Sequence, residues 1–271
     1  MLKRINNERV SAVPVIGGAD TRPVKGADLF AEPYANVFLL AKKKSGKSSV
    51  IYKIIDDCSE RNTKVLAFCS TIYKDNVWIQ IAELCKKKGL YFEPHTSLKE
   101  DGIDILEEFL ISESAPDVAT EETEKATSSI LFDDDEPKAK KVKKPKKLAC
   151  DWLIVIDDLS TELKSKSVEA LLKKNRHLKS KVIISSQYLC DLKPESRKQM
   201  DYVLAFRSLT GDKLKTVYQD TDLSIDYTEF EKLYRISTHE PYSFFYIDVR
   251  NDEFRRNFSD KFVLDNKDEK R

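Results

Sequence analysis

A lysine-rich loop between an apolar segment and a helical segment is the feature that most constrains the fold of this chain. Residues 36–40 read Asn-Val-Phe-Leu-Leu, residues 41–48 read Ala-Lys-Lys-Lys-Ser-Gly-Lys-Ser, and a segment with helical spacing follows. The middle segment matches G-x-x-x-x-G-K-[ST] except at its first position, where Ala41 replaces glycine. A strand, a tight loop and a helix in this order place backbone N–H groups where they can cradle phosphate oxygens. We therefore predict a phosphate-binding loop; the alternative is a chance Gly-Lys-Ser.

The loop pattern assigns a role to several of its residues. Gly46 allows a close approach of the backbone, Lys47 binds the β- and γ-phosphates, and Ser48 coordinates Mg²⁺. Ala41 has to fit without the positive φ that glycine adopts freely. The three lysines between them either raise the local potential or are simply solvated. The predicted nucleotide-binding residues are Ala41, Lys42, Lys43, Lys44, Ser45, Gly46, Lys47, Ser48 and Ser49.

Short apolar segments alternate with longer helical segments along the rest of the chain. The predicted strands are residues 36–40, 64–69, 152–156, 181–185, 202–206 and 243–248. The predicted helices are residues 47–60, 74–88, 100–111, 161–175, 211–219 and 228–235. Nearly continuous runs of Val, Ile, Leu and Phe indicate strands that are buried on both faces. The alternation predicts an α/β domain with a mainly parallel central sheet and helices on both faces.

A segment with separated blocks of charge interrupts this alternation. Residues 112–150 hold 9 acidic residues and 8 lysines, with all of the acids before Pro137 and all but one of the lysines after it. Such blocks repel internally and rarely pack, so we predict a disordered insertion. Residues 137–147 are similar to a basic nuclear-import stretch, while a solvated spacer and a DNA-binding segment are the alternatives. The predicted organisation is a lead-in (1–27), one domain (28–262) carrying this insertion, and a charged tail (263–271).

The overall composition excludes several classes of protein. The chain has 47 Lys and Arg against 46 Asp and Glu, which argues against a polybasic nucleic-acid coat. Its apolar runs are far shorter than the roughly 20 residues of a membrane span, and its first residues lack the apolar core of a secretion signal. The 5 cysteines are scattered without a CxxC pair. This pattern is typical of reduced intracellular thiols, not of disulfides or a zinc site.

Two adjacent acids follow the apolar run 152–156. Paired carboxylates at the carboxyl end of a buried strand are costly unless they bind something, and ligands bind at that edge of an α/β sheet. Asp157 is suited to holding Mg²⁺, directly or through water, and Asp158 to orienting or deprotonating an attacking water. The alternative is a helix cap, since Asp157 to Ser160 precede a predicted helix.

Two further polar residues are candidates for the same edge. Gln187 follows the predicted strand 181–185, where it could sense a γ-phosphate or hold the water; a simple turn is the alternative. Arg176 ends the predicted helix 161–175, where it could reach a neighbouring subunit's γ-phosphate from the same edge. A charge that is favourable at a helix C-terminus explains it equally well.

Taken together, these motifs resemble a known family. The pattern comprises residues 41–48, 153–159, 175–177 and 183–187, followed by Pro-Tyr-Ser-Phe-Phe-Tyr-Ile-Asp and Glu-Phe-Arg-Arg-Asn-Phe within 241–258. It resembles the genome-packaging ATPases of large eukaryotic DNA viruses, the poxvirus-type enzymes of the FtsK/HerA division of P-loop ATPases. The resemblance covers roughly 28–111 and 151–262. It implies a RecA-like sheet with extra strands between the phosphate loop and the acid pair.

The resemblance also implies an activity and its residues. The expected protein is an oligomeric ring that hydrolyses ATP and moves double-stranded DNA into a capsid. By motif, Lys47 and Ser48 bind ATP and Mg²⁺, Asp157 binds the metal, Asp158 is the catalytic acid, Gln187 is the sensor and Arg176 is the finger that acts on a neighbour.

The resemblance also implies binding partners and a cellular location, and the sequence departs from the family pattern at two positions. The expected partners are double-stranded DNA, capsid proteins and further copies of the chain, inside an infected host cell or in the virion. Ala41 replaces the usual glycine, and Asp158 stands where related motors often carry Glu, whose longer side chain reaches further toward the water. The alternatives are a non-hydrolysing nucleotide-binding assembly factor, or another P-loop NTPase such as a small-molecule kinase.

Overall fold

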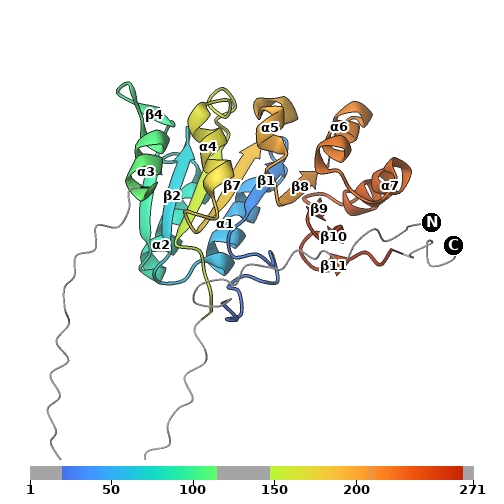
Figure 1. Ribbon diagram of the computed structural model, residues 1–271, viewed down its shortest axis with the longest axis horizontal. Helices are drawn as coiled ribbons and strands as arrows, with labels where there is room; N and C mark the ends of the chain where they lie inside the picture. The colour runs from blue at the N-terminus through green and yellow to red at the C-terminus, as the bar shows by residue number, and fades with distance from the viewer. Residues whose placement is uncertain (1–19, 115–146, 208, 265–271) are drawn as a thin grey trace, which may run out of the picture.

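A single large sheet organises the computed structural model, which describes residues 20–114, 147–207 and 209–264 (Figure 1). Nine strands form this sheet in the order β11-β10-β9-β8-β1-β7-β6-β2-β3. Their bounds are β1 Asn36–Leu40, β2 Lys64–Cys69, β3 Tyr91–His95, β6 Trp152–Asp157, β7 Ser180–Ser186, β8 Tyr202–Phe206, β9 Phe244–Asp248, β10 Glu253–Arg256 and β11 Asp260–Lys261. The predicted strands are all present, with bounds that differ by at most one residue at either end.

The sheet is parallel except at one edge. Strands β3, β2, β6, β7, β1 and β8 pair in parallel, whereas β9, β10 and β11 add to β8 as antiparallel neighbours. A separate hairpin joins β4 (Lys99–Glu100) to β5 (Ile103–Asp104). The mainly parallel sheet is therefore confirmed, and β2 and β3 are the extra strands expected between the loop and the acid pair.

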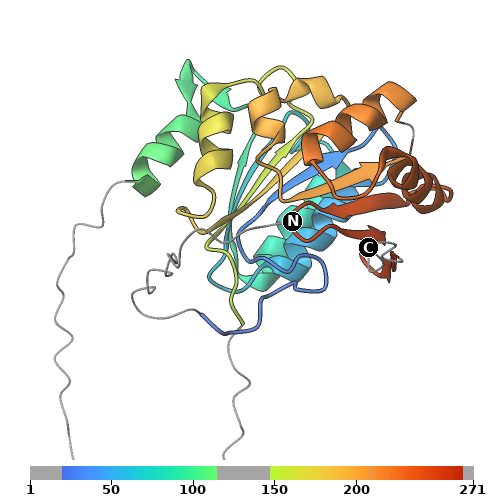
Figure 2. The same ribbon diagram turned by 45° about the vertical axis from the view of Figure 1, so that its right-hand side comes forward.

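Helices cover both faces of this sheet (Figure 2). Helices α1 (Lys47–Cys58) and α2 (Asn76–Lys88) pack on one face. The other face carries α3 (Ile105–Ser114), α4 (Lys166–Lys174), α6 (Gly211–Thr221) and α7 (Tyr227–Ser237), with the short α5 (Pro194–Arg197) and a 3₁₀ turn (Leu189–Asp191) nearby. Within β1, Phe38 and Leu40 face one layer while Val37 and Leu39 face the other. Burial on both faces explains why the strands are continuous apolar runs.

Two predicted helices begin five residues later than expected, for local reasons. The predicted helix 161–175 starts at Lys166, because the Ser165 hydroxyl accepts a hydrogen bond from the Val168 N–H at 3.2 Å and caps it. The predicted helix 100–111 starts at Ile105, because the preceding residues form the β4–β5 hairpin, which turns at Gly102 with a φ of 84°. A glycine that adopts positive φ was the available signal for that turn.

The described residues narrow the bounds of the predicted insertion 112–150. Helix α3 continues to Ser114, and Leu148 forms a bridge with Val24 of the lead-in. The Lys25 N–H donates to the Leu148 carbonyl at 2.7 Å, and Cys150 is buried. Residues 115–146, with nearly all of the import-like stretch, lie outside the described residues, as do 1–19 and 265–271. None of the helices in the described ranges is long and apolar enough to cross a bilayer.

Candidate functional site

The loop after β1 has the local structure that its sequence predicts. The Ala41 N–H donates to the Ser186 carbonyl at 3.0 Å, and the Ser45 hydroxyl donates to the Lys42 carbonyl at 2.7 Å. Helix α1 begins at Lys47, directly after Gly46, whose φ is 88°. Ala41 is buried and is not among the residues with positive φ. Alanine therefore fits the first position of the loop without the backbone strain that a positive φ would bring.

Lys47 lies between the two predicted acids. Its Nζ is 3.0 Å from Oδ1 of Asp157 and 2.6 Å from Oδ2 of Asp158. Successive residues of a strand point to opposite faces, so both carboxylates could not reach one cation if β6 simply continued. The chain instead turns at Asp158, whose φ is 55°. This turn at the end of β6 brings both acids onto Lys47.

The charge on Lys47 is held by its two partners. Burial lowers the pKa of the amine, but the attraction of Asp157 and the contacts with Asp158 outweigh it, so the net direction is a raised pKa. Nζ lies at ion-pair distance from both carboxylates, and Lys47 itself is buried. Lys47 is thus a buried ammonium held mainly by charge.

Asp157 is surrounded by hydrogen-bond donors. Its Oδ1 accepts from the Ser185 hydroxyl, and its Oδ2 accepts from the Trp78 indole N–H at 3.1 Å and lies 3.9 Å from the Cys69 sulfur. Asp157 belongs to β6, and the cap of the next helix is Ser165. The helix-cap alternative for Asp157 is therefore wrong.

Trp78 was not predicted to belong to the site. It comes from α2 and is almost fully buried against the sheet. Its contact with an acid 79 residues later depends on the packing of α2 beneath β2 and β6. The one sequence signal for this contact was the tryptophan itself. A buried indole N–H usually needs a hydrogen-bond acceptor, and the rest of this helix face is apolar.

Gln187 reaches the same edge from the neighbouring strand. It directly follows β7, which pairs with both β1 and β6, and its Nε2 is 3.5 Å from Oδ1 of Asp158. The structure thus brings together the residues predicted from three separate motifs. They are the loop residues 41–49, Asp157, Asp158 and Gln187.

Arg176 lies at the opposite edge of the sheet. It follows α4 and precedes β7, and its guanidinium contacts Asp201, which precedes β8, at 3.2 Å. Both residues are at the amino ends of parallel strands, whereas the phosphate loop is at the carboxyl end of β1. The expectation that Arg176 shares an edge with the loop is therefore wrong. Its action on a neighbouring subunit stays a prediction.

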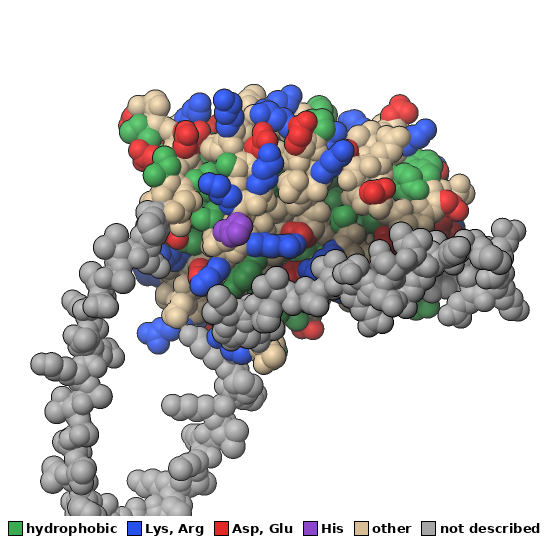
Figure 3. Space-filling model, viewed as in Figure 1, with side chains coloured by type: hydrophobic (Ala, Val, Ile, Leu, Met, Phe, Trp, Pro, Cys, Tyr) green, Lys and Arg blue, Asp and Glu red, His purple; other side chains and the backbone are tan. Residues whose placement is uncertain are grey.

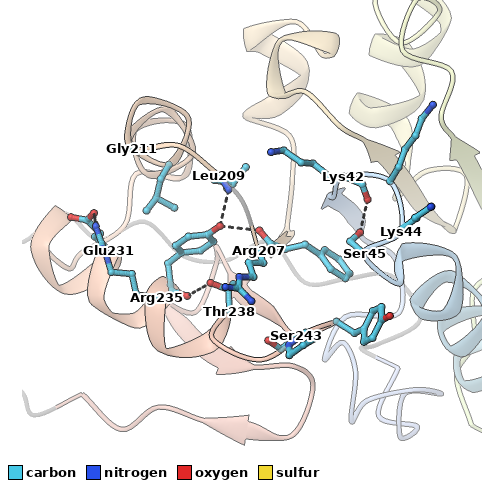
Figure 4. Close-up of a pocket in the computed structure, with 16 residues that line it drawn as sticks. Lys42, Lys44, Ser45, Arg207, Leu209, Gly211, Glu231, Arg235, Thr238 and Ser243 are labelled. Carbon is cyan, nitrogen blue, oxygen red and sulfur yellow. Dashed lines mark hydrogen bonds and ion pairs between the residues drawn. The ribbon is translucent and has the colours of Figure 1, made fainter.

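A cavity of about 680 Å³ adjoins the outer side of the loop (Figure 4). We call it the cationic cavity, because Lys42, Lys43, Lys44, Arg207 and Arg235 line it. Figure 4 shows the loop residues on one side and the helix α7 residues on the other, with Arg207 between them. Arg235 pairs with Glu231 at 2.7 Å, whereas the three loop lysines form no ion pair within the described part of the chain.

A second cavity, of about 530 Å³, lies beside the first turn of α1. We call it the aromatic cavity, because Tyr242, Phe244 and Phe258 line it together with Gly46 and Ser49. Tyr242 lines both cavities. Neither Tyr242 nor Arg207 was predicted to belong to the site.

Comparisons with known proteins agree with this architecture. The genome-packaging NTPase B204 from Sulfolobus turreted icosahedral virus 2, in complex with AMP, has a TM-score of 0.53 and 18% sequence identity, covering 83% of this chain and 96% of that one. The DNA-packaging ATPase B204 from Sulfolobus turreted icosahedral virus has a TM-score of 0.52 and 17% identity, covering 82% and 96%. At these identities the likeness establishes the fold. The predicted α/β fold with a mainly parallel sheet is thus confirmed, and it is similar to the fold of these two viral packaging proteins.

The sequence comparisons reach less of the chain. An uncharacterised protein, 075L of Invertebrate iridescent virus 6, is 33% identical over 101 residues, which is 36% of this chain. The chain spans about two fifths of that relative, since the match covers 39% of it. No protein-family model matches the chain.

Proposed function

We propose that this chain is an ATP-hydrolysing DNA translocase that packages viral genomic double-stranded DNA into a capsid. One observation carries the proposal: Lys47 of the phosphate loop lies against Asp157 and Asp158 at the carboxyl edge of the sheet. The likeness in fold to B204, described as a genome-packaging NTPase, supports it. The viral source of the sequence relative agrees with it.

The proposed nucleotide site uses the loop and the first turn of α1. Backbone N–H groups of residues 41–49 bind the phosphates of ATP, and the positive end of α1 adds to their attraction. Lys47 exchanges its contacts with the carboxylates for contacts with the β- and γ-phosphates.

The donor set also fits Mg²⁺, which prefers oxygen ligands and keeps several waters. Ser48 supplies a hydroxyl and Asp157 a carboxylate. Because both oxygens of Asp157 already accept hydrogen bonds from neighbours, it suits contact through a metal-bound water better than direct ligation. A Mg²⁺ ion held by these two residues would supply positive charge that offsets the charge of the phosphates.

The hydrolytic step is assigned to the residues around Asp158. Its side chain is 30% exposed, whereas that of Asp157 is 4% exposed, so Asp158 is the acid that a water can approach. Its carboxylate orients the attacking water and accepts its proton. Gln187, whose Nε2 is 3.5 Å from this carboxylate, helps to position the same water.

The remaining parts of the proposal concern assembly. We propose that copies of the chain form a ring around DNA, with Arg176 acting on a neighbour's nucleotide, and that the ring engages capsid proteins inside the infected cell or in the virion. Figure 3 shows Lys and Arg side chains along the upper surface, over α4 and α5, with Asp and Glu side chains among them. Cations on such a surface suit contact with DNA phosphates.

The test is phosphate release from ATP, with and without duplex DNA. We expect turnover that DNA stimulates. Asp158→Asn should keep ATP binding and lose turnover by at least about 100-fold, as for loss of a general base. Lys47→Ala should lose both binding and turnover, while Asp212→Asn, an exposed acid on α6, should behave as wild type.

Two outcomes would contradict the proposal. Turnover that survives both Lys47→Ala and Asp158→Asn would exclude the assigned site. Wild-type protein that binds ATP in the presence of duplex DNA without hydrolysing it would favour the non-hydrolysing assembly factor.

A further inference from the structure

Tyr242 combines a strained backbone with an exposed side chain, and none of the roles assigned above explains this combination. Its backbone has a φ of 63°, a region that bulky side chains rarely adopt. The residue is 71% exposed, so little packing compensates for that conformation. Strained residues persist where the surrounding structure holds them, and they cluster at ligand sites. The strained backbone of Tyr242 is therefore consistent with a ligand site next to this residue.

The ring of Tyr242 lies against the phosphate loop. A Cβ placed on Gly46 would lie 3.4 Å from Cδ1 of Tyr242, so the ring flanks the glycine that approaches the phosphates. Tyr242 also forms one wall of the aromatic cavity, which Gly46 and Ser49 border. A phosphate chain bound at the loop therefore has this cavity directly beside it.

Phe258 forms a second aromatic surface of the cavity, and it is fixed in place. Its ring packs against Phe244 and Tyr246 with centroids 5.1 and 6.1 Å apart. The neighbouring Asn257 accepts a hydrogen bond from the Phe244 N–H at 3.1 Å, which ties this wall to β9. The cavity thus has one exposed aromatic wall and one rigid aromatic wall. Its volume of about 530 Å³ is within the range of small-ligand sites, roughly 300–1,000 Å³.

We propose that the aromatic cavity binds the nucleoside part of the nucleotide, with the base stacked on Tyr242. This inference rests on the proposed nucleotide site and adds the residue that recognises the base. A neutral, flat, aromatic ligand suits an aromatic cavity, because every base has a face that stacks on an aromatic side chain. The cationic cavity, lined by loop lysines and Arg207, suits anions instead.

The test compares ATP with inorganic tripolyphosphate, which carries the phosphate chain without a nucleoside. Tyr242→Ala should weaken ATP binding roughly tenfold, as for the loss of one base stack, and leave tripolyphosphate binding unchanged. Tyr242→Phe keeps the ring and should bind ATP as wild type does. Tyr73→Ala, which removes a tyrosine that is 65% exposed beyond β2, is the matched control.

A second variant separates binding from folding. Tyr242→Gly removes the ring but suits positive φ, so it should unfold at a temperature at least as high as wild type while binding ATP as weakly as Tyr242→Ala. A purely structural role for Tyr242 predicts the reverse, namely lower stability and unchanged binding.

Filling each cavity in turn identifies which one the nucleoside occupies. Val50→Phe projects a ring into the aromatic cavity and should weaken ATP binding but not tripolyphosphate binding. Gly211→Phe projects a ring into the cationic cavity, where a Cβ meets nothing within 4 Å, and should leave both unchanged. ATP binding that is lost with Gly211→Phe and kept with Val50→Phe would place the nucleoside in the other cavity and overturn the inference.

Different results would contradict the base-stacking role of Tyr242 and the proposed function of the chain. If Tyr242→Ala binds ATP like wild type while Lys47→Ala does not bind, the base platform is wrong and the nucleotide site stands. If Tyr242→Ala weakens ATP and tripolyphosphate equally, the ring acts through Gly46 and the platform is also wrong. If wild-type protein binds neither ligand, the proposed function itself fails.

Discussion

Replacing Lys47 with methionine tests the central ion cluster without any nucleotide. Methionine is similar in length to the aliphatic part of the lysine side chain, but it leaves Asp157 and Asp158 without their shared cation. Removing one partner of a buried ion pair costs about 3–5 kcal/mol. Asp157 keeps its hydrogen bonds from Ser185 and Trp78, and Asp158 is 30% exposed, so the lower end applies. We expect the free energy of unfolding to fall by about 3 kcal/mol.

The measurement is urea and thermal unfolding of the nucleotide-free protein. A loss of about 3 kcal/mol corresponds to a fall in the unfolding midpoint of roughly 6–12 °C for a domain of this size. Asp157→Asn in the same background removes one of the two unbalanced charges. The double variant should therefore lose at least about 1 kcal/mol less than the sum of the two single variants, since residues in contact couple.

The pH dependence of the stability difference between wild type and Lys47→Met tests whether that difference is electrostatic. The pKa of Lys47 is raised above the ordinary lysine value of 10.5, because its carboxylate neighbours outweigh the opposing effect of burial. Its stabilising contribution is therefore fully present below that value and is lost as pH rises through the raised pKa. The stability gap between wild type and Lys47→Met should be constant from pH 7 to about 10 and should shrink above it. An unchanged or higher midpoint for Lys47→Met at pH 7, or strict additivity in the cycle, would refute the reasoning.

Three further substitutions probe the elements around this cluster. Gly46→Ala should destabilise the protein by about 1–2 kcal/mol in urea unfolding, because its φ of 88° is left-handed. Trp78→Phe removes the indole N–H from Asp157 and should lower kcat about tenfold with an unchanged KM for ATP; a change in KM alone would argue against a positioning role. Arg197→Met breaks a largely buried pair with Asp220 at 2.6 Å and should cost about 3 kcal/mol in thermal unfolding; a cost under about 1 kcal/mol would place the pair among surface ion pairs.

The fold was predictable wherever a strand is buried on both faces. The bounds of β1, β2 and β8 match the predicted segments, because continuous apolar runs of this length are typical of strands that are buried on both faces of a parallel sheet. The resemblance implied extra strands in this region, but the apolar pattern alone did not locate β3, because it is an edge strand, half exposed, and carries Pro94. Proline is tolerated at a sheet edge, yet in a sequence it argues against a strand. A half-exposed edge strand of this kind does not produce the continuous apolar run by which the buried strands were recognised in the sequence.

The site was predictable where its parts are local motifs and unpredictable where they depend on packing. Gly46, Lys47 and Ser48 are neighbours in the chain, and the chain turns into α1 as their pattern predicts. That both acids share one cation depends on the positive φ of Asp158, which a sequence does not display. The contribution of Tyr242 to both cavities depends on how the segment before β9 passes the loop.

Arg176 and Arg207 show how chain direction decides which edge of the sheet a residue occupies. In a parallel α/β unit, residues that follow a strand lie at the carboxyl edge, and residues that follow a helix have returned to the amino edge. Arg207 follows β8 and so lies beside the phosphate loop, whereas Arg176 follows α4 and lies at the far edge. A ring in which Arg176 reaches a neighbour's nucleotide must therefore place the amino edge of one subunit against the carboxyl edge of the next. Such a head-to-tail contact is the heterologous kind that closes into rings. A ring that instead used Arg207 would have to bring two carboxyl edges together.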